Sequence, residues 1–420
     1  MRDISTTALA SMPDEALLER IQQQTFRFFW EGAEHASGLA RDRNEQKGDA
    51  RDNLAAVGGS GFGIMALVVA TDRGWVSRID AVERLSQMLD VLERAIRYHG
   101  VFPHFLDGAS GATIAFGPMD DGGDLVETSL LMMGLLTARR YFDRPEEASL
   151  KARITRLWEE VEWDWHVQPG QQVLTWHWSP NHGFAMNHAI RGWNECLITY
   201  LLAAASPNHA IAPDIYESGF CAGPDYRNAN TYYGIELPLG PALGGPLFFA
   251  HYSFCGLNPH GLSDAHANYW EQNVAQTRIN LAHCIANPNG FAGYSKDCWG
   301  LTASDDPSGY EAHAPGNDNG TISPTAALSS IVYAPQEVIN ALRYFLVEYG
   351  NKIWGRYGFT DAFNPARNWY ANTFLAIDQG PIIVMIENYR SGLLWDLFMS
   401  VPEVRHGLGR LGFAFRNNNA

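Results

Sequence analysis

The sequence predicts an all-α protein whose helices form a double ring, an (α/α)6 toroid. Six apolar stretches recur at intervals of 55 to 79 residues, and each follows a loop marked by Gly, Pro or Asp. Stretches with a single apolar face lie between them. A helix that is apolar on every side has to be buried, whereas a helix with one polar face lies outside. Six inner helices are therefore expected within six outer ones, and the inner helices begin near residues 59, 121, 187, 244, 323 and 378.

The outer helices are predicted by apolar residues that recur at helical spacing. They are expected over residues 13–34, 78–97, 146–165, 265–286 and 335–349, with a short helix near 212–219. The fourth unit is the weakest, because residues 207–243 are rich in Pro, Gly and Asn. No linker-like composition interrupts the repeat, so residues 1–420 are expected to form a single domain with an N-terminal extension over about residues 1–12.

A glycine-rich run, Gly58–Gly63, precedes the apolar run Ile64–Ala70. It has some likeness to a phosphate-binding loop, but no Lys-Ser/Thr pair follows it and no strand is indicated before it. A tight loop against which other backbone packs is therefore predicted for the glycines.

The composition favours a neutral substrate. The chain has 420 residues, of which 46% are hydrophobic and 12% are aromatic, enough for a large core. Its 13 Trp and 17 Tyr residues exceed what a core needs, which indicates a groove lined with rings. The net charge is −16 and no lysine-rich run occurs, so nucleic acid and anionic membranes are poor partners.

Cysteine usage and hydropathy exclude several classes of protein. The five cysteines are odd in number and lack any Cys-x-x-Cys spacing, so small buried residues are expected rather than a disulfide scaffold or a zinc site. No apolar run is long enough to span a membrane. The first residues lack a signal-peptide core, which predicts a cytoplasmic protein if the chain is complete and a periplasmic one if a leader has been removed. A monomer without cofactor or metal is expected.

The most informative stretch covers residues 174–195 and ends on a carboxylate, Glu195. It contains three tryptophans and three histidines: Trp176, Trp178, Trp193, His177, His182 and His188. Aromatic faces with polar side chains between them suit a sugar, which has apolar C–H faces and a rim of hydroxyls. Asn187 is predicted to cap an inner helix that carries Glu195 about two turns inside it.

Further carboxylates are expected where the loops meet the inner helices. Asp120, Asp124 and Glu127 are spaced i, i+4 and i+7, which places them on one face at a helix start. Asp378 opens the last inner helix and Glu387 lies within it. Glycosidic hydrolysis needs such a set, because one carboxyl group protonates the leaving oxygen and another activates water.

Other chemistries are less well supported. Asp120–Asp124 spells the Asp-Asp-x-x-Asp motif of terpenoid synthases, but the second metal motif of those enzymes is absent. The three histidines of residues 174–195 lack the spacing of a zinc site. The polar stretch 302–323 could bind calcium through its Asp residues. A loop that lines the cleft, with Tyr310 and His313 as sugar contacts, is the preferred interpretation.

Together these residues resemble the glycoamylase-like domain, the group that contains glycoside hydrolase family 144. The stretches that carry the resemblance are Phe26–Gly32, Ser37–Arg43, Gly58–Ala70, Asp120–Leu136, Thr175–Glu195, Gly244–Gly256, Ala267–Asn273, Trp299–Asp306, Asp318–Ser330 and Ile377–Leu394. The resemblance implies an (α/α)6 toroid that degrades β-1,2-glucan with inversion and without a cofactor. It also implies that the family's acidic positions are matched by five residues: Asp120, Asp124, Glu127, Glu195 and Asp378.

Within this set, Glu195 is predicted to be the general acid, because a carboxyl group in apolar surroundings has a raised pKa. Asp124 is predicted to be the base, with Asp378 in reserve. All three are expected around one cleft, since the starts of inner helices share one rim. The predicted substrate contacts are Trp176, His177, Trp178, His188, Trp193, Tyr310, His313, Glu387 and Tyr389.

The expected activity is therefore the endo-acting, inverting hydrolysis of β-1,2-glucan or sophoro-oligosaccharides. A transglycosylase and an exo-acting hydrolase of sophoro-oligosaccharides stay open as alternatives. A protein of another class, which binds β-glucan without cleaving it, also remains possible. The sequence does not determine chain-length preference or oligomeric state.

Overall fold

The fold was analysed in a computed structural model that describes residues 5–47 and 53–415. Helices dominate these residues, which confirms the predicted predominance of helix. The α-helices are α1 (Thr6–Ala10), α2 (Asp14–Trp30), α3 (Val57–Asp72), α4 (Arg78–Arg94), α5 (Leu125–Tyr141), α6 (Ala148–Glu159), α7 (Leu197–Ala205), α8 (Tyr269–Ala286), α9 (Pro324–Leu328), α10 (Pro335–Tyr344), α11 (Gly350–Ile353), α12 (Ala376–Arg390), α13 (Leu393–Met399) and α14 (Pro402–Arg410).

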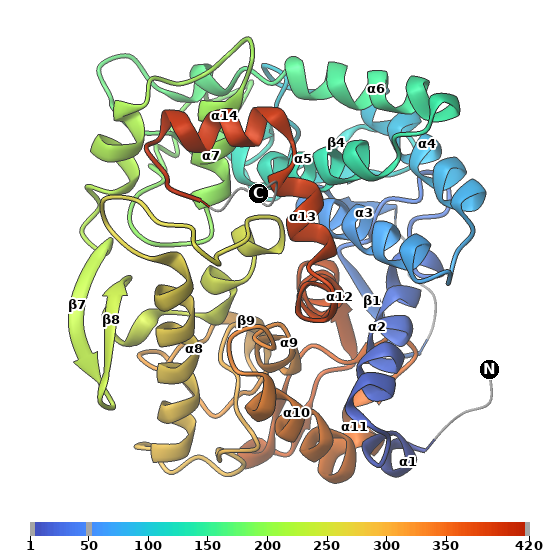
Figure 1. Ribbon diagram of the computed structural model, residues 1–420, viewed down its shortest axis with the longest axis vertical. Helices are drawn as coiled ribbons and strands as arrows, with labels where there is room; N and C mark the ends of the chain where they lie inside the picture. Colours follow the sequence, from blue (N-terminus) through green and yellow to red (C-terminus); the bar gives the residue numbers. More distant parts are fainter. Residues whose placement is uncertain (1–4, 48–52, 416–420) are drawn as a thin grey trace.

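The strands are short and pair mainly into small antiparallel ribbons. They are β1 (Arg43–Glu45), β2 (Leu54–Ala56), β3 (Phe105–Asp107), β4 (Thr113–Ile114), β5 (Gly123–Asp124), β6 (His177–Trp178), β7 (Arg227–Tyr232), β8 (Ile235–Leu239), β9 (Ala303–Asp306), β10 (Gly309–Ala312), β11 (Trp354–Gly355), β12 (Gly358–Phe359), β13 (Phe363–Asn364), β14 (Trp369–Tyr370) and β15 (Thr373–Leu375). The β7–β8 hairpin lies at one edge of the molecule, whereas α12 lies near its centre (Figure 1).

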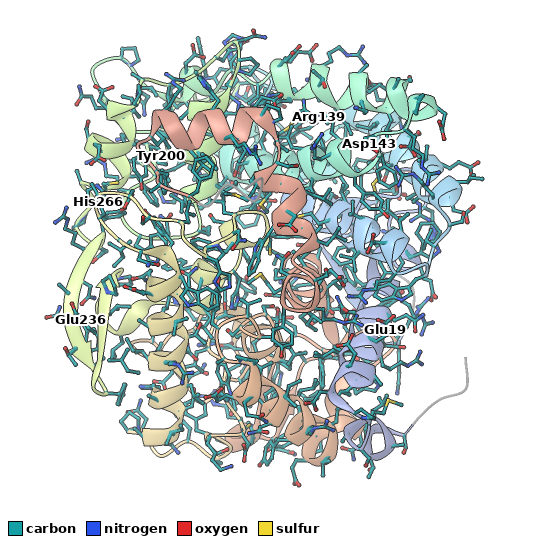
Figure 2. The ribbon with its side chains drawn as sticks, viewed as in Figure 1. Glu19, Arg139, Asp143, Tyr200, Glu236 and His266 are labelled. Carbon is teal, nitrogen blue, oxygen red and sulfur yellow. The ribbon has the colours of Figure 1, made fainter. Side chains whose placement is uncertain are left out.

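The two predicted kinds of helix are both present. In α3 every residue from Val57 to Ala70 is buried, and α5 and α12 are also buried on most sides. By contrast, α2, α4 and α6 bury one face and expose the other, as expected of outer helices. Tyr200 of α7 lies inside the molecule, whereas Glu236 of the β7–β8 hairpin lies at its edge (Figure 2).

The prediction of a loop at Gly58–Gly63 is wrong, because these residues form the first turns of α3. The glycines are needed there for close packing rather than for a turn. A Cβ on Gly61 would lie 2.2 Å from the carbonyl oxygen of Leu130 in α5, and a Cβ on Gly134 would lie 2.2 Å from the carbonyl oxygen of Gly61. The backbones of α3 and α5 are therefore in direct contact.

The third inner helix begins later than predicted. Helix α7 starts at Leu197, so Glu195 lies in the preceding loop, and Asn187 has a left-handed backbone (φ 45°) instead of capping a helix. The chain before α7 pairs with neighbouring segments: Ile190 N–H donates to the carbonyl of Leu174, and Trp193 N–H donates to the carbonyl of Asp225. These bonds satisfy the backbone groups that a helix would otherwise have paired.

The later inner stretches are also shorter than predicted. Residues 247–255 form two 3₁₀ turns, Leu247–Ala250 and Ser253–Cys255, and α9 has five residues. The final stretch is divided at Gly392, whose φ of 76° ends the run of α12 and allows α13 to begin. The apolar character of these stretches predicted their burial correctly, but not their backbone conformation.

All five cysteines are free and buried, as predicted. Within residues 5–47 and 53–415, no helix combines the length and apolar character needed to cross a membrane. Residues before α2 include the short helix α1, whose Leu9 is buried against the rest of the protein.

Replacing Gly61 with alanine should destabilise the protein by several kcal/mol, because the new methyl group would collide with the backbone of α5. Gly409→Ala in α14 is the matched control: a Cβ there has no neighbour within 4 Å, and alanine in an exposed helix should stabilise by about 0.5–1 kcal/mol. Chemical denaturation of both variants measures the difference. A Gly61→Ala protein as stable as the wild type would contradict the close contact.

Candidate active site

A cavity of about 360 Å³ lies where several inner helices begin. Its wall includes Gly59 of α3, Glu127 of α5 and Ile377 of α12, all in the first turns of their helices, and Glu195 just before α7. Helix N-termini carry partial positive charge, which favours negative groups nearby. The structure therefore brings carboxylates from distant parts of the sequence to one end of the helices.

Rings form much of the remaining wall. The aromatic residues that line the cavity are His104, Phe105, Phe116, Trp176, Phe248, Tyr252 and Tyr310. The ring of Trp176 is partly buried, and His188 stacks on it with ring centres 4.9 Å apart. Three carboxylates, Asp42, Glu127 and Glu195, lie among these rings, and Arg43 adds a positive charge. Such a wall can contact both the C–H faces and the hydroxyl groups of a sugar.

Asp124 is fully buried, and its oxygens are occupied. Oδ1 caps α5 by accepting the N–H groups of Val126 (3.0 Å) and Glu127 (2.9 Å), and it also accepts Nε1–H of Trp176 (2.9 Å). Oδ2 is bonded to Nδ1 of His104 at 3.0 Å. Burial acts to raise the pKa of Asp124, but the hydrogen bond and charge of His104 outweigh it and lower the pKa. Asp124 is therefore a permanent anion that anchors Trp176 and His104.

His104 is the cation of the site. Burial alone would lower its pKa, but the negative charges of Glu127 and Asp124, together with the bond to Asp124, raise it to about 10. A protonated imidazole donates from both nitrogens. His104 therefore donates to Asp124 and keeps one N–H available at the cavity wall.

Glu127 presents a carboxyl group to the cavity. Its Oε2 accepts the backbone N–H of Gly58 at 2.6 Å, so the α3–α5 contact also holds this side chain. Its other oxygen has no hydrogen-bond partner among the residues that the structure describes. Burial, reinforced by the charge of Asp124, raises the pKa of Glu127 to about 7. Glu127 can therefore exchange a proton near neutral pH.

Glu195 faces the same cavity from the loop before α7. The loop is fixed by Ser253, whose hydroxyl donates to the Glu195 carbonyl at 2.5 Å and accepts the N–H of Ile198 at 3.0 Å. The residue is partly accessible through the cavity but surrounded by protein, and this burial raises its pKa to about 7. The predicted raised pKa is thus present, although the residue is not in a helix.

Asp120 lies in a turn before α5 rather than on the helix face that the spacing predicted. Nε2 of His177 is 3.4 Å from Oδ2 of Asp120 and 3.7 Å from Oδ2 of Asp124. Burial and the charge of Asp124 raise the pKa of Asp120 to about 6, whereas burial lowers that of His177. His177 is therefore neutral beside two acidic groups.

Asp378 is buried against a second carboxyl group, Asp361. Oδ2 of Asp361 accepts the N–H of Asp305 at 2.6 Å, while Oδ1 of Asp361 and Oδ2 of Asp378 receive no donor from the other described residues. The two carboxyl groups are hydrogen-bonded to each other, which requires a proton on one of them. Burial and this pairing raise the pKa of Asp361 to about 7 and that of Asp378 well above its usual range.

Arg43 connects this acidic pair to the cavity. Its Nη1 bonds Oδ1 of Asp305 at 2.6 Å, and the other oxygen of Asp305 accepts the hydroxyl of Thr373 at 2.5 Å. The guanidinium lies 5.8 Å from the ring centre of Tyr310, which lines the cavity as predicted. Arg43 and Tyr310 thus form a polar part of the cavity wall.

Seven predicted substrate contacts lie outside the cavity wall: His177 and His188, whose rings stack beside Trp176, and Trp178, Trp193, His313, Glu387 and Tyr389. Trp193 packs on Tyr269 in the core, and Trp178 packs on His99 next to β6. Core tryptophans and cleft tryptophans look alike in sequence, so the sequence alone did not separate these two from Trp176, which lines the cavity. His313 is buried beside Asp306, with Nε2 3.4 Å from its Oδ2.

Glu387 and Tyr389 lie in the second half of α12, away from the cavity wall. Glu387 is held by Nε and Nη2 of Arg73 at 2.9 and 2.7 Å, so it balances a charge inside the protein. Tyr389 is 45% exposed close to the C-terminal end of the helix. Of α12, only Ile377 in the first turn lines the cavity.

Several residues of the site had no signal strong enough to select them. His104 and Tyr252 are single residues in ordinary loops and turns, and Asp361 lies between short strands. Arg43 belongs to a stretch that resembles the family, but the sequence does not show that it pairs with Asp305. Tertiary contacts alone assign these residues to the site.

The arrangement is suited to proton transfer. His104, Asp120 and Asp124 have ligand atoms within 4.8 Å of one another, a spacing that a metal ion also requires. Nδ1 of His104 and Oδ2 of Asp124 are already bonded to each other at 3.0 Å. Two carboxyl groups with pKa values near 7 face one ring-lined cavity, which is what acid and base catalysis of glycoside cleavage needs.

Comparison with known proteins is consistent with this chemistry. A family model described as "Putative glucoamylase" matches residues 187–402. An endo-β-1,2-glucanase from Chitinophaga pinensis, solved with sophorotriose and glucose, is 48% identical, with 96% of this chain and 99% of that one covered and a TM-score of 0.93. A β-1,2-glucanase from Parabacteroides distasonis is 45% identical over 96% of this chain and 60% of that one, with a TM-score of 0.92.

An exo β-1,2-glucooligosaccharide sophorohydrolase (non-reducing end) of Parabacteroides distasonis is 46% identical over 95% of this chain. The chain spans 58% of the length of that curated relative. The family model covers more than half of the chain, and the similarity to the Chitinophaga structure extends over nearly all of both chains. The chain therefore belongs to the glycoamylase-like family, the group of glycoside hydrolase family 144.

Proposed function

We propose that the protein is a glycoside hydrolase that cleaves β-1,2-glucan and sophoro-oligosaccharides with inversion at the anomeric carbon. The observation that carries this proposal is the pair of raised-pKa carboxyl groups, Glu127 and Glu195, at one cavity lined by aromatic rings. The β-1,2 linkage is supported by the relatives that are 45–48% identical, which are two β-1,2-glucanases and a β-1,2-glucooligosaccharide sophorohydrolase.

The fold that supports this activity is an (α/α)6 toroid within a single domain over residues 1–420. Helix α12 packs against both α2 and α3, so the last helix of the repeat contacts the first pair. Buried helices (α3, α5, α7, α9 and α12) alternate along the chain with helices that expose one face (α2, α4, α6, α8 and α10). The 3₁₀ turns of residues 247–255 take the remaining inner position.

Glu195 is the general acid in this mechanism. Its raised pKa keeps a proton on the carboxyl group near neutral pH, and that proton passes to the glycosidic oxygen as the C1–O bond breaks. The side chain faces the cavity, where the scissile bond would lie beside Trp176.

Glu127 is the base in preference to Asp124. Asp124 has a lowered pKa and gives its oxygens to Val126, Trp176 and His104, so it is a weak acceptor of another proton. Glu127 keeps an oxygen free at the cavity wall. A water molecule there would attack C1 with its oxygen and give its proton to Glu127, so that one water is consumed for each bond cleaved.

The His104 cation and the Asp124 anion position these groups. His104 partly offsets the charge that Glu127 acquires on ionisation, and it holds the imidazolium N–H at the wall. The proton shared by Asp361 and Asp378 keeps that pair from adding two negative charges beside Tyr310. Asp378 is therefore a poorer candidate for the base than Glu127.

Endo-acting cleavage is the leading form of the proposal, and exo-acting release of sophorose is the alternative, because relatives of both kinds are known by name. Incubation of the protein with linear β-1,2-glucan, laminarin, cellulose and starch tests the linkage. Endo action should produce a range of oligosaccharide lengths early, whereas exo action should produce sophorose alone. Longer products from sophoro-oligosaccharides would indicate transglycosylation, and cleavage only of the other polymers would reject the proposed linkage.

Glu195→Gln should lower kcat on sophoro-oligosaccharides at least ~100-fold with little change in binding, because a carboxamide cannot donate the catalytic proton. In the wild type, kcat/KM should fall as the pH rises above about 7, where Glu195 loses its proton. An aryl β-sophoroside with an acidic phenol needs less protonation, so the variant should retain more activity on it. Equal losses on both substrates would argue against the acid role.

Glu127→Gln should also lower kcat at least ~100-fold, since no carboxylate would then accept the proton of the attacking water. Asp124→Asn is the informative comparison, because it removes a buried anion without removing the proposed base. It should disturb the ring of Trp176, and thereby KM and stability, more than it disturbs the proton transfer. Proton NMR of the first product should show the α-anomer, and a β-anomer would exclude inversion.

A further inference from the structure

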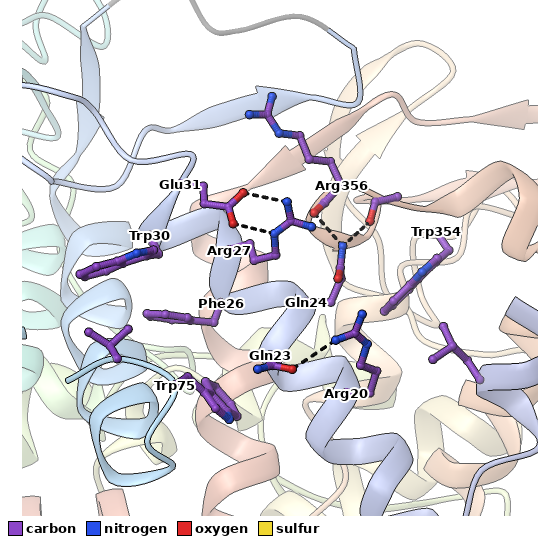
Figure 3. Close-up of a pocket in the computed structure, with 13 residues that line it drawn as sticks. Arg20, Gln23, Gln24, Phe26, Arg27, Trp30, Glu31, Trp75, Trp354 and Arg356 are labelled. Carbon is purple, nitrogen blue, oxygen red and sulfur yellow. Dashed lines mark hydrogen bonds and ion pairs between the residues drawn. The ribbon is translucent and has the colours of Figure 1, made fainter. Parts of the chain in front are cut away.

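A second pocket lies against the outer side of α2, apart from the cavity (Figure 3). Its volume is about 660 Å³, and it is lined by α2, by the turn between α3 and α4, and by residues 354–356. It shares no lining residue with the candidate active site. Ligand pockets in proteins commonly have volumes of about 300–1,000 Å³.

Aromatic rings stand at both ends of this pocket. Figure 3 shows Phe26, Trp30 and Trp75 on one side and Trp354 on the other. The ring centres of Phe26 lie 6.0 Å from those of Trp30 and 5.9 Å from those of Trp75. The three tryptophans are only partly buried, and all three line the pocket.

Contacts behind the rings fix their orientation. The guanidinium of Arg84 lies 4.2 Å from the ring centre of Trp30, and Nε1 of Trp75 donates to Glu19 at 2.7 Å. Trp354 packs edge-on against Phe359 at 5.0 Å. Rings that are already oriented lose little freedom when a ligand binds to them.

Polar side chains of α2 lie between the two groups of rings. Nε2 of Gln24 donates to the carbonyls of Gly355 and Arg356 at 3.1 and 2.9 Å, which joins α2 to the far wall. Oε1 of Gln23 accepts from Arg20 at 3.2 Å, while its amide N–H₂ donates to no residue that the structure describes. Gln23 therefore offers donors in the middle of the pocket.

We propose that this pocket binds a segment of β-linked glucan outside the active site, an inference that rests on the proposed function. The indole faces match the C–H faces of glucose units, and the amide and guanidinium groups match their hydroxyls. The lining carries Arg20, Arg27, Arg356 and Glu31, and Glu31 pairs with Arg27 through both of its oxygens at 2.8 Å, so an anionic ligand is the alternative that the salt dependence tests. A second site on one chain raises the local concentration of a polymeric substrate at the first.

Binding of linear β-1,2-glucan and of sophorotriose should be compared by affinity electrophoresis and calorimetry. Glu195→Gln serves as the background, so that the polymer is not cleaved. Trp354→Ala should weaken binding of the polymer about three- to tenfold, the range expected for loss of one ring contact. The affinity for sophorotriose should change by less than about twofold, because a short ligand binds first in the active-site cavity. Gln23→Ala removes a polar side chain of the same pocket and should also weaken binding of the polymer. Because Gln23 lies on the partly exposed face of α2, its loss should not prevent folding.

Tyr389→Ala is the matched control, because it removes a partly exposed ring outside both pockets. Unchanged polymer binding in both Trp354→Ala and Gln23→Ala would overturn the inference. So would an affinity that collapses when salt is raised to about 0.5 M, since that dependence indicates an anionic ligand. The proposed function fails by a different result, the absence of new reducing ends when the wild type meets β-1,2-glucan.

Discussion

The direct backbone contact between α3 and α5 is the constraint on which both the core and the site depend. Gly61 and Gly134 face each other's helices at distances that leave no room for a side chain. The same approach brings the N–H of Gly58 to Oε2 of Glu127 at 2.6 Å. Because one contact packs two buried helices and also orients a carboxyl group, the core fixes the position of Glu127 in the cavity wall.

Several acidic groups can lie close together at this end of the helices because their surroundings shift their pKa values in different directions. Asp124 is ionised and satisfied by donors from α5, Trp176 and His104, whereas burial favours the protonated forms of Glu127 and Glu195. Environments that push pKa values apart are how neighbouring carboxyl groups take separate acid and base roles. The shared proton of Asp361 and Asp378 follows the same principle.

Irregular segments supply much of what the helices cannot. Glu195 lies in a loop, and Tyr252 lies between two 3₁₀ turns. Arg43 lies on β1 opposite Leu375 of β15, and its guanidinium donates to Asp305, which also accepts the hydroxyl of Thr373. Side chains on such segments can approach a ligand from directions that a helix start does not provide, so the regular helices form the scaffold and the loops complete the cavity.

The sequence by itself determined which stretches are buried, because apolar periodicity reports burial: the outer helices, the apolar run Ile64–Ala70 and the buried runs of α5 and α12 all followed from it. It could not distinguish a loop from a helix at Gly58–Gly63. A loop needs glycine for its backbone angles, whereas this helix needs it for close packing against α5. Nor could it separate Trp176 at the cavity from Trp193 in the core, or recognise His104. Those assignments depend on which distant groups come within hydrogen-bonding range, and only the tertiary structure decides that.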